Sequence, residues 1–488
     1  MNSSLLPTGQ HITMPWQTLF ALTPELRHEH RLHLIGIGGT GLAPIANVLL
    51  EMGFQVSGSD LAPSPRTEDL AASGVFLSIG HDATHLFCTR EPALPDLVLV
   101  SSAIPTGNPE ILAAQEFDVP IVKRKDLLGP LTSGRQVIGV AGTHGKTTTT
   151  GMVAHVLKGS GMEPGYIIGS SIPGLGISAA GSGPHFVIEA DEYDDAFLGL
   201  RPQVIIITNI DWDHPDFFPS AEVYEASFSR FVDQVQPGGY IVYCQDDNCL
   251  RALAEQRGNS HWLGYGARTD AQWRVQDVDI SPAGTTYQLR SPAGDLTGAK
   301  LRIPGFHNAI NSAAALLAAR LVGVAETQAA PLLSTYQGAG RRFEIKGEAG
   351  GVLVVDDYAH HPTEIRATLA AARAAYSDRE IWAVYQPHTY SRTRTLQDRF
   401  EGAFGAADHV LITDIYAARE PYDPSVTSAQ VAASSRHPDA RSAGSLADTL
   451  AYLLDHVQAG SLVIILSAGS ATQLGPLLLD QLAAPVPQ

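Results

Sequence analysis

Cysteine is scarce in this sequence, which has only Cys88, Cys244 and Cys249 among 488 residues. The number is odd and the spacing fits no metal site, so the cysteines indicate neither a disulfide scaffold nor a zinc module. Scattered cysteines of this kind are typical of a reducing compartment, and we expect a cytoplasmic location. We assign them no role in function.

Long apolar runs and positive charge are also in short supply. No apolar stretch reaches the ~18 residues of a membrane span, and no charged segment followed by an apolar run marks a signal peptide. The chain has 32 Lys and Arg against 50 Asp and Glu, a net charge of −18. Because nucleic acids and anionic membranes bind clustered basic residues, we expect neither as a partner.

What the chain does contain is a globular composition, 44% hydrophobic and 17% charged. At 488 residues it exceeds the size of a single core, and we predict three domains. From Arg31 onward, short β-branched and aliphatic runs alternate with helical patterns, which predicts parallel α/β architecture. Residues 1–30 carry prolines and no clear periodicity, so we expect a loose N-terminal extension.

Three α/β blocks follow this extension. Residues 31–133 are typical of a Rossmann-like domain, residues 134–337 of a central domain, and residues 338–488 of a third α/β domain. Within the central block, alternation replaces helical periodicity over 271–304, which predicts a β-rich insertion. Predicted strands lie at 32–37, 55–58, 75–79, 97–101, 136–141, 186–189, 204–208, 352–356, 381–385, 409–413 and 462–466, and predicted helices at 41–52 and 307–322.

The strongest local signal is a glycine loop placed where a predicted strand ends and a helix begins. It consists of Gly142, Thr143, His144, Gly145, Lys146, Thr147 and Thr148. Backbone N–H groups of such a loop surround phosphate oxygens, Lys146 reaches the β- and γ-phosphates, and Thr147 can hold Mg²⁺. Val140 stands where the full P-loop pattern has its first glycine. The loop predicts an ATP site, and the alternative is a structural turn with a surface lysine.

A second glycine-rich turn, Gly36–Gly41, follows the first predicted strand, and Asp60 ends the next one. Read alone, this pair is a dinucleotide fingerprint in which the acidic residue binds a ribose hydroxyl. Its glycines run G-x-G-G-x-G, which departs from the usual spacing. The turn therefore fits NAD, another nucleotide with a diphosphate, or a tight turn without a ligand.

Carboxylates cluster downstream of the P-loop, directly after an apolar strand. They form the run Glu189–Asp195, and the next apolar strand ends in a segment that supplies His214. The C-terminal ends of strands beside a phosphate loop are where oxygen ligands hold Mg²⁺. The arrangement predicts two metal ions that bridge ATP and a second substrate, and the alternative is a solvated acidic surface.

Three further clusters can complete a site. His307–Asn311 opens a helix, where capping is the alternative to an adenine contact. Arg341–Glu344 follows two glycines at a domain boundary, where a surface charge pair is the alternative. Asp356–Pro362 joins a strand to a helix that its proline can start. Its pair of histidines can bind zinc, but no third ligand stands at a convincing spacing, so we predict no zinc site.

Taken in order, these motifs resemble the Mur ligases of bacterial cell-wall synthesis. The resemblance runs from about Arg31 to the C-terminus and also includes Ser57–Asp60, Ser101–Ile104 and Gln386–Arg394. It implies a ligase that uses ATP to activate a carboxylate as an acyl phosphate and joins it to an amine. It also implies a Rossmann-like N-terminal domain that holds a UDP-sugar, a central P-loop ATPase domain with a parallel sheet, and a Rossmann-like C-terminal domain that binds the amino acid.

The family's site residues carry over position by position. The UDP-sugar would be bound by Gly36, Gly38, Gly39, Gly41, Asp60, Ser101 and Ser102. ATP would be bound by the P-loop residues, with Lys146 as the catalytic lysine, and by Asn308, Arg342 and Asp357. The amino acid would be bound by Tyr358, His360 and Arg392, with His360 as a possible acceptor of the amine's proton. The Mg²⁺ ions would be bound by Thr147, Glu189 and His214.

Two positions depart from the family pattern and bear on the identity of the amine. Many relatives have Ser where this chain has Tyr193, and Tyr at this place resembles ligases that recycle a murein tripeptide. Many also have Arg where this chain has Thr389. The segment Gln386–Arg394 favours the branch that joins L-alanine to UDP-N-acetylmuramate. The tripeptide is the alternative amine.

The expected chemistry is phosphoryl transfer from ATP to the muramoyl carboxylate. Such a transfer needs alignment and charge neutralisation, which Lys146 and two Mg²⁺ ions would supply, and the amine of L-alanine would then attack the acyl phosphate. Two alternative functions belong to other classes of protein. An NAD-dependent oxidoreductase leaves the P-loop without a role, and a regulatory P-loop switch would hydrolyse ATP without UDP-N-acetylmuramate.

Overall fold

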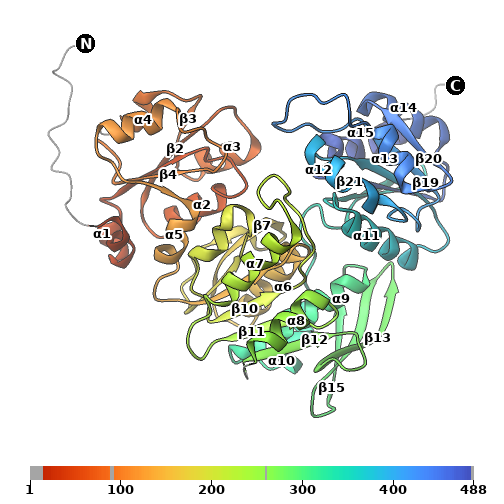
Figure 1. Cartoon of the computed structure of the whole chain (residues 1–488), viewed down its shortest axis with the longest axis horizontal. Helices are drawn as coiled ribbons and strands as arrows, with labels where there is room; N and C mark the ends of the chain where they lie inside the picture. The colour runs from red at the N-terminus through yellow and green to blue at the C-terminus, as the bar shows by residue number, and fades with distance from the viewer. Residues whose placement is uncertain (1–14, 88–92, 259–260, 485–488) are drawn as a thin grey trace. The chain divides into compact units, whose positions relative to one another are not determined.

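The structure is a computed structural model that describes residues 15–87, 93–258 and 261–484 (Figure 1). Cys88, to which we assigned no role, lies outside these residues. The chain divides into two compact units. Unit 1 comprises Met1–Ala141, Leu157–Ile206 and Ser227–Ile241, and unit 2 comprises Gly142–Val156, Ile207–Ala226 and Val242–Gln488.

Unit 1 contains a five-stranded parallel sheet in the order β3-β2-β1-β4-β5. Strands β1 and β4 are buried along their whole length, as expected where helices cover both faces of a parallel sheet. This order is that of a Rossmann-like fold, in which ligands bind at the C-terminal ends of the strands. The elements are β1 (Arg31–Ile35), α2 (Ala43–Glu51), β2 (Gln55–Asp60), α3 (Pro65–Ala72), β3 (Phe76–Ile79), η2 (Ala83–Phe87), β4 (Leu97–Val100), α4 (Pro109–Glu116), β5 (Ile121–Lys123) and α5 (Arg124–Leu131).

The segment before β1 differs from the loose extension that we predicted for residues 1–30. Its described part forms a 3₁₀ helix, η1 (Trp16–Ala21), and one turn of α-helix, α1 (Pro24–Arg27). Phe20 is buried, and its ring lies 5.4 Å from the ring of Phe54. The prediction is therefore wrong for this part, because apolar packing holds it against the sheet domain.

A second set of strands in unit 1 runs in the order β10-β6-β9-β7-β8. Strand β9 is parallel to both β6 and β7, whereas β7 and β8 form an antiparallel pair. Glu189 ends β9 and lies opposite Val140 of β6 in the ladder. The elements are β6 (Gln136–Ala141), β7 (Gly165–Ile172), β8 (Gly176–Ala179), β9 (His185–Glu189), η3 (Tyr193–Gly199) and β10 (Val204–Ile207).

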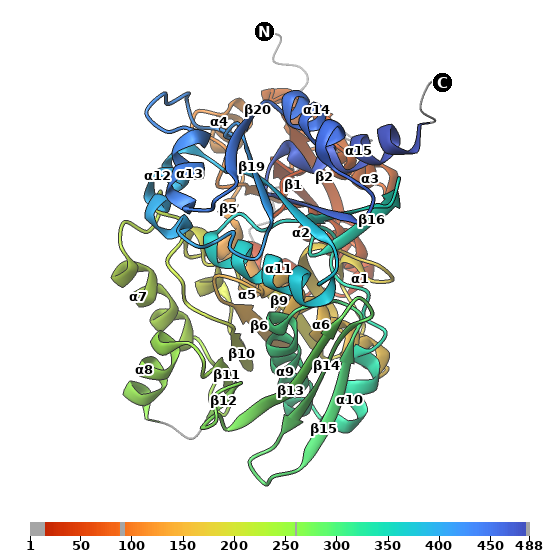
Figure 2. The ribbon, with the colours of Figure 1, turned by 90° about the vertical axis from the view of Figure 1, so that its right-hand side faces the viewer.

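Unit 2 contains the β-rich insertion that the sequence predicts. Strand β12 pairs in parallel with β13, and β13, β14 and β15 form antiparallel pairs. Helix α9 packs on β13 and β14, and α10 packs on β15 (Figure 2). The elements are β12 (Trp262–Gly266), β13 (Trp273–Ser281), β14 (Gly284–Arg290), β15 (Leu296–Leu301), α9 (Phe306–Leu321) and α10 (Glu326–Leu333). Helices α6 (Lys146–Gly159) and α7 (Ala221–Val232) and strand β11 (Tyr240–Cys244) contribute residues to both units, and α8 (Asn248–Arg257) lies in unit 2.

The rest of unit 2 is a six-stranded sheet in the order β16-β17-β21-β18-β19-β20, parallel except for β16. Successive residues of β17 and β21 belong to two separate hydrophobic clusters, one with α11 and α13 and one with α14 and α15. Helices therefore cover both faces. The elements are β16 (Glu344–Ala349), β17 (Val352–Asp357), α11 (Pro362–Ala375), β18 (Glu380–Gln386), α12 (Tyr390–Thr395), η4 (Gln397–Phe400), β19 (His409–Thr413), α13 (Ser428–Ser435), β20 (Ala440–Gly444), α14 (Leu446–His456), β21 (Ser461–Ser467), η5 (Ser470–Gln473) and α15 (Leu474–Ala483).

Every strand predicted from the sequence is present, with its ends shifted by no more than two residues. The α/β class is confirmed by the parallel pairs in all three sheets. Within the described ranges, no helix combines the length and the apolar character that crossing a membrane requires.

Candidate active site

Glycine determines the shape of the loop between β6 and α6 (Lys146–Gly159). Gly142 and Gly145 have φ values of 131° and 83°, a region that glycine adopts at little cost. A Cβ on Gly142 would lie 2.1 Å from Oγ1 of Thr208, and a Cβ on Gly145 would lie 2.7 Å from Oδ1 of Asn311. The loop backbone therefore packs directly against two other segments, and a larger residue at either position would displace it.

The segment after β10 holds the loop in place. The side chain of Asn209 accepts a hydrogen bond from the N–H of His144 at 2.9 Å and donates one to the His144 carbonyl oxygen at 3.0 Å. Oγ1 of Thr208 donates to the same carbonyl oxygen at 2.5 Å. Nζ of Lys146 donates to two loop carbonyl oxygens at 2.5 and 3.1 Å, so the ammonium group lies against the loop.

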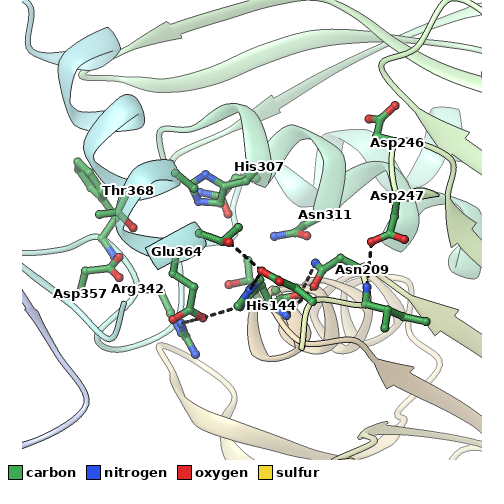
Figure 3. A pocket seen from close by; sticks show the side chains of 18 of the residues that line it. His144, Asn209, Asp246, Asp247, His307, Asn311, Arg342, Asp357, Glu364 and Thr368 are labelled. Atoms are coloured by element: carbon green, nitrogen blue, oxygen red, sulfur yellow. Dashed lines mark hydrogen bonds and ion pairs between the residues drawn. The ribbon is translucent and has the colours of Figure 1, made fainter. Parts of the chain in front are cut away.

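A cavity of about 510 Å³ lies beside the loop (Figure 3). Its volume falls within the roughly 300–1,000 Å³ that is usual for small-molecule sites. Its walls come from the loop, the segment after β10, the starts of α8 and α9, the segment before β16, the end of β17 and the first turns of α11. The predicted ATP residues in these walls are His144, Gly145, Thr148, Asn308, Arg342 and Asp357.

The start of α9 contributes neutral groups to the cavity. Nδ2 of Asn308 donates to the carbonyl oxygen of Pro304 at 2.8 Å, and the helix is preceded by Gly305, which has no capping side chain. The Asn308 side chain therefore does not cap the helix, which was the alternative to an adenine contact. Burial lowers the pKa of His307 to about 4, so its ring is neutral at pH 7. Such groups suit a neutral heterocycle.

Charged side chains line the cavity next to the loop. Nε2 of His144 lies 3.1 Å from Oδ2 of Asp211, and Nδ1 lies 3.3 Å from Oε1 of Glu364. Burial alone would lower the pKa of His144, but the hydrogen bonds to these carboxylates outweigh it and raise the pKa to about 9. Asp211 is also bound by Arg399 at 2.5 Å and by the hydroxyl of Thr363 at 2.7 Å. The imidazolium of His144 therefore adds positive charge beside the phosphate loop at pH 7.

His144, Asp211 and His361 bring three possible metal-ligand atoms within 4.8 Å of one another. The fold thus supplies partners for one histidine of the pair that we considered for zinc. Two of the three are otherwise engaged: the Thr363 N–H donates to Nδ1 of His361 at 3.2 Å, and Asp211 binds Arg399. Since positive groups oppose a bound cation, the arrangement favours a hydrogen-bond network over a zinc site.

The predicted amino-acid residues lie close together in unit 2. The rings of Tyr358 and His360 meet edge to face, with 5.4 Å between their centroids. Nε of Arg392 lies 3.0 Å from Oδ1 of Asp213, and Nη2 of Arg392 donates to Nδ1 of His214 at 3.2 Å. Arg392 therefore already binds a carboxylate of the chain, and Nε2 of His214 lies 3.9 Å from Oδ2 of the same Asp213.

The tautomer of His360 follows from its partner. Nδ1 lies 3.0 Å from the carbonyl oxygen of Tyr358, which can only accept, so Nδ1 carries the proton and Nε2 the lone pair. Burial lowers the pKa of His360 to about 3. The ring is therefore neutral at pH 7, with a nitrogen able to accept a hydrogen bond, and it is a weak base.

The predicted UDP-sugar residues lie in unit 1. The N–H groups of Gly38 and Leu61 donate to the two carboxylate oxygens of Asp60, each at 2.8 Å. Gly36 has a φ of 79°, and a Cβ there would lie 3.1 Å from Cβ of Ser101. Asp60 thus closes the glycine turn through the main chain, which differs from the ribose contact that an NAD site would require.

Most carboxylates of the acidic run are paired within unit 1 instead of forming a solvated surface. The ion pairs are Asp191 with Arg124 (2.6 Å), Asp194 with Lys123 (3.5 Å) and Asp195 with Arg230 (2.8 Å). Oγ of Ser102 also donates to Asp194 at 3.0 Å. Glu189 accepts a hydrogen bond from the N–H of Gly169 at 2.8 Å. Of the predicted metal ligands, Glu189 belongs to unit 1, and Thr147 and His214 belong to unit 2.

Three family models match most of the chain. They are the Mur ligase family catalytic domain over residues 31–136, the Mur ligase middle domain over 140–319, and the Mur ligase glutamate ligase domain over 341–469. The chain belongs to the Mur ligase family. The resemblance inferred from the ordered motifs is thereby confirmed. As a Mur ligase the protein is an ATP-dependent ligase, which excludes the oxidoreductase and the regulatory switch as readings of its glycine loops.

Individual relatives agree with this assignment. A UDP-N-acetylmuramate–L-alanine ligase of Kineococcus radiotolerans is 42% identical and covers 93% of this chain and 96% of its own length. The crystal structure of a UDP-N-acetylmuramate-alanine ligase from Thermotoga maritima matches with a TM-score of 0.76 at 26% identity, over 92% of this chain and 98% of that one. The crystal structure of a murein peptide ligase from Psychrobacter arcticus matches with a TM-score of 0.67 at 26% identity, over 94% of this chain and 100% of that one.

Several residues of this Mur ligase site were overlooked in the sequence. Asp211 and Asp213 stand in a segment from which we chose only His214, and nothing local shows that they bind Arg399 and Arg392, nearly 190 and 180 residues away. Glu364 stands at the third position of α11, a pattern that predicts a capping box but not a contact with the phosphate loop.

Proposed function

We propose that this protein joins L-alanine to UDP-N-acetylmuramate through an acyl phosphate, in peptidoglycan precursor synthesis. The observation that carries the proposal is the 42% identity, over 96% of its length, to a relative named UDP-N-acetylmuramate–L-alanine ligase. The cavity beside the phosphate loop supports it, because its lining includes the neutral ring of His307, the imidazolium of His144 and the guanidinium of Arg342, which suit a heterocycle and phosphates.

We assign the residues of the cavity to ATP. The phosphates lie on the loop with Lys146 and the imidazolium of His144, and the adenine contacts Asn308. Arg342 adds a guanidinium next to the same cavity. Asp357 accepts hydrogen bonds from the N–H groups of Phe343 and Ala359, each at 2.7 Å, which fixes its carboxylate for a ribose contact. This arrangement holds the γ-phosphate in one position, as phosphoryl transfer requires.

Two Mg²⁺ ions are part of the proposal, and the donor set fits them. Thr147 offers a hydroxyl oxygen at the start of α6, and Glu189 offers a carboxylate at the end of β9. Oxygen atoms of this kind are the ligands that Mg²⁺ prefers. His214 is the third proposed ligand, and an imidazole nitrogen is a further atom type that a divalent metal can bind. When bound, the ions neutralise phosphate charge during transfer.

The amino acid is assigned to Tyr358, His360 and Arg392. The carboxylate of L-alanine binds the guanidinium of Arg392, which turns from Asp213 towards it or binds both. Nε2 of His360 accepts a hydrogen bond from the amine, which orients the nitrogen for attack on the acyl phosphate. The neutral state of His360 supports this role, because a protonated Nε2 could not accept a hydrogen bond from the amine.

The remaining assignments concern unit 1 and the division of the chain. The glycine turn Gly36–Gly41, with Asp60, Ser101 and Ser102, binds the UDP diphosphate and sugar. We propose domains at 31–133, 134–337 and 338–488, which the spans of the three family models support. The need for ATP supports a reaction in the cytoplasm.

The alternative amine is a murein tripeptide. Tyr193 favours it, and so does the match to a murein peptide ligase at 26% identity. The test of the proposed function is release of ADP by the purified full chain with Mg²⁺. We expect release only when ATP, UDP-N-acetylmuramate and L-alanine are all present. Equal release without UDP-N-acetylmuramate would overturn the proposal.

A further inference from the structure

Glu364 has a fixed position at the start of α11 (Pro362–Ala375). The N–H groups of His360 and His361 donate to its Oε2 at 3.1 and 3.3 Å, which folds the carboxylate back over the helix N-terminus. The helix is capped by His361 and has Glu364 as its third residue, the geometry of a capping box. The helix start therefore anchors Oε2, while Oε1 is left to the residues of the cavity.

The same carboxylate contacts three residues that belong to different motifs. Oε1 lies 3.3 Å from Nδ1 of His144 and 3.7 Å from Nη1 of Arg342. Oε2 lies 3.3 Å from Nδ1 of His360. Only 11% of the Glu364 side chain is exposed, and it lines the cavity (Figure 3). One buried negative charge thus joins the phosphate loop, an arginine of the ATP cavity and a histidine of the amino-acid pocket.

The charges make these contacts strong. Burial alone would raise the pKa of Glu364, but the imidazolium of His144 and the guanidinium of Arg342 hold it well below its usual range. An ionised carboxylate in a site shielded from water interacts with its partners more strongly than at the surface. Loss of the charge would leave the imidazolium of His144 with Asp211 as its remaining carboxylate partner in this network.

We propose that Glu364 is a positioning residue that couples ATP binding to amino-acid binding. A nucleotide that orders His144 and Arg342 also orders Glu364, and through it His360. The amino acid then meets a pocket whose histidine is already oriented, so its binding loses less conformational freedom. Because coupling is reciprocal, the amino acid tightens nucleotide binding by the same factor. The inference rests on the amino-acid pocket of the proposed function.

Glu364→Gln tests this role. Glutamine at the third helix position still completes a capping box, so the variant keeps the helix start and loses the charge. Calorimetry on the full chain, with Mg²⁺ and saturating UDP-N-acetylmuramate, gives the Kd of L-alanine with and without the non-hydrolysable analogue AMP-PNP. We expect the analogue to tighten L-alanine binding about tenfold in the wild type, within the usual range of coupling, and less than about twofold in the variant.

Asp448→Asn is the matched control. Asp448 is the third residue of α14 (Leu446–His456) and completes a capping box with Ser445, but it is exposed and lines no part of the cavity. It should keep the tenfold coupling. Glu364→Asp, which keeps the charge on a shorter side chain, should restore part of it. A structural effect of helix capping alone would instead appear in both capping variants.

A second variant keeps the inference testable if Glu364→Gln does not fold. His144→Asn removes the loop partner of the same contact, and it should abolish the coupling as well. In the double variant the losses of AMP-PNP affinity should not add, because both changes break one interaction. Coupling that persists in either single variant would overturn the inference. A wild type that binds no L-alanine in any state would refute the proposed function instead.

Discussion

Replacing Asp211 by Asn should lower the pKa of His144 measurably. The pKa stands at about 9 against 6.5 for an unperturbed histidine, and Asp211 and Glu364 approach the ring at similar distances, 3.1 and 3.3 Å. The difference of about 2.5 pH units corresponds to ~3.4 kcal/mol at ~1.36 kcal/mol per unit. Since one of two comparable partners is lost while burial still opposes the charge, we expect the pKa to fall by at least about one pH unit, or ~1.4 kcal/mol.

The assay is NMR of the protein labelled with ¹³C at the histidine rings, titrated from pH 5 to 10. The signal absent from His144→Gln identifies the residue. Asp246→Asn is the matched control, because Asp246 lines the same cavity but binds the N–H of Ala267. A wild-type pKa near 6.5, or an equal pKa in Asp211→Asn, would refute the charged network.

The raised pKa also has a consequence for stability. A group whose pKa is higher in the folded than in the unfolded state stabilises the fold fully below the unfolded value. For His144 this stabilisation is complete below about pH 6.5 and is lost as the pH rises through about 9. ATP affinity should weaken over the same alkaline range, because the imidazolium beside the phosphate loop becomes neutral.

Three further substitutions separate the sites. Lys146→Ala should abolish ATP turnover and leave UDP-N-acetylmuramate binding intact by calorimetry; normal ADP release would refute its role. Gly38→Ala places a Cβ 2.6 Å from Cγ2 of Thr67, so the KM for UDP-N-acetylmuramate should rise about tenfold, as overpacking of ~1–3 kcal/mol implies, with the KM for ATP unchanged. An equal rise in both KM values would contradict a separate sugar site. Arg392→Ala should raise the KM for L-alanine ~10- to 100-fold, since charged hydrogen bonds contribute about 1.5–3 kcal/mol. An unchanged KM would exclude Arg392 from the pocket.

Much of the fold could be predicted because buried parallel strands are continuous apolar runs. Leu97–Val100 and Val204–Ile207 are such runs, and both were placed to within a residue. The strands β5 (Ile121–Lys123) and β20 (Ala440–Gly444) were not predicted, since short edge strands with exposed residues lack this signal. The helices before β1 were missed because Phe20 is ordered by a contact with Phe54, which no local pattern shows.

The residues of the candidate site also fall into those that a local sequence pattern reveals and those that only folding brings together. Residues inside a motif, such as Lys146 and Asn308, could be found because each stands at a fixed spacing from the glycine loop or the helix start to which it belongs. Glu364 and Asp211 could not, because folding brings them to His144, from which both lie more than 60 residues away in the sequence. The pKa values of His144 and His360 could not be predicted from the sequence either, because burial and carboxylates brought close by folding determine them.

The central claim is that a single L-alanine is the amine. The most direct measurement compares kcat/KM for L-alanine, glycine, L-serine and the murein tripeptide, each with saturating ATP and UDP-N-acetylmuramate, and identifies each product by mass. The account predicts that L-alanine exceeds every other amine by at least about tenfold, the discrimination that one small apolar contact can supply. A higher kcat/KM for the tripeptide would contradict it.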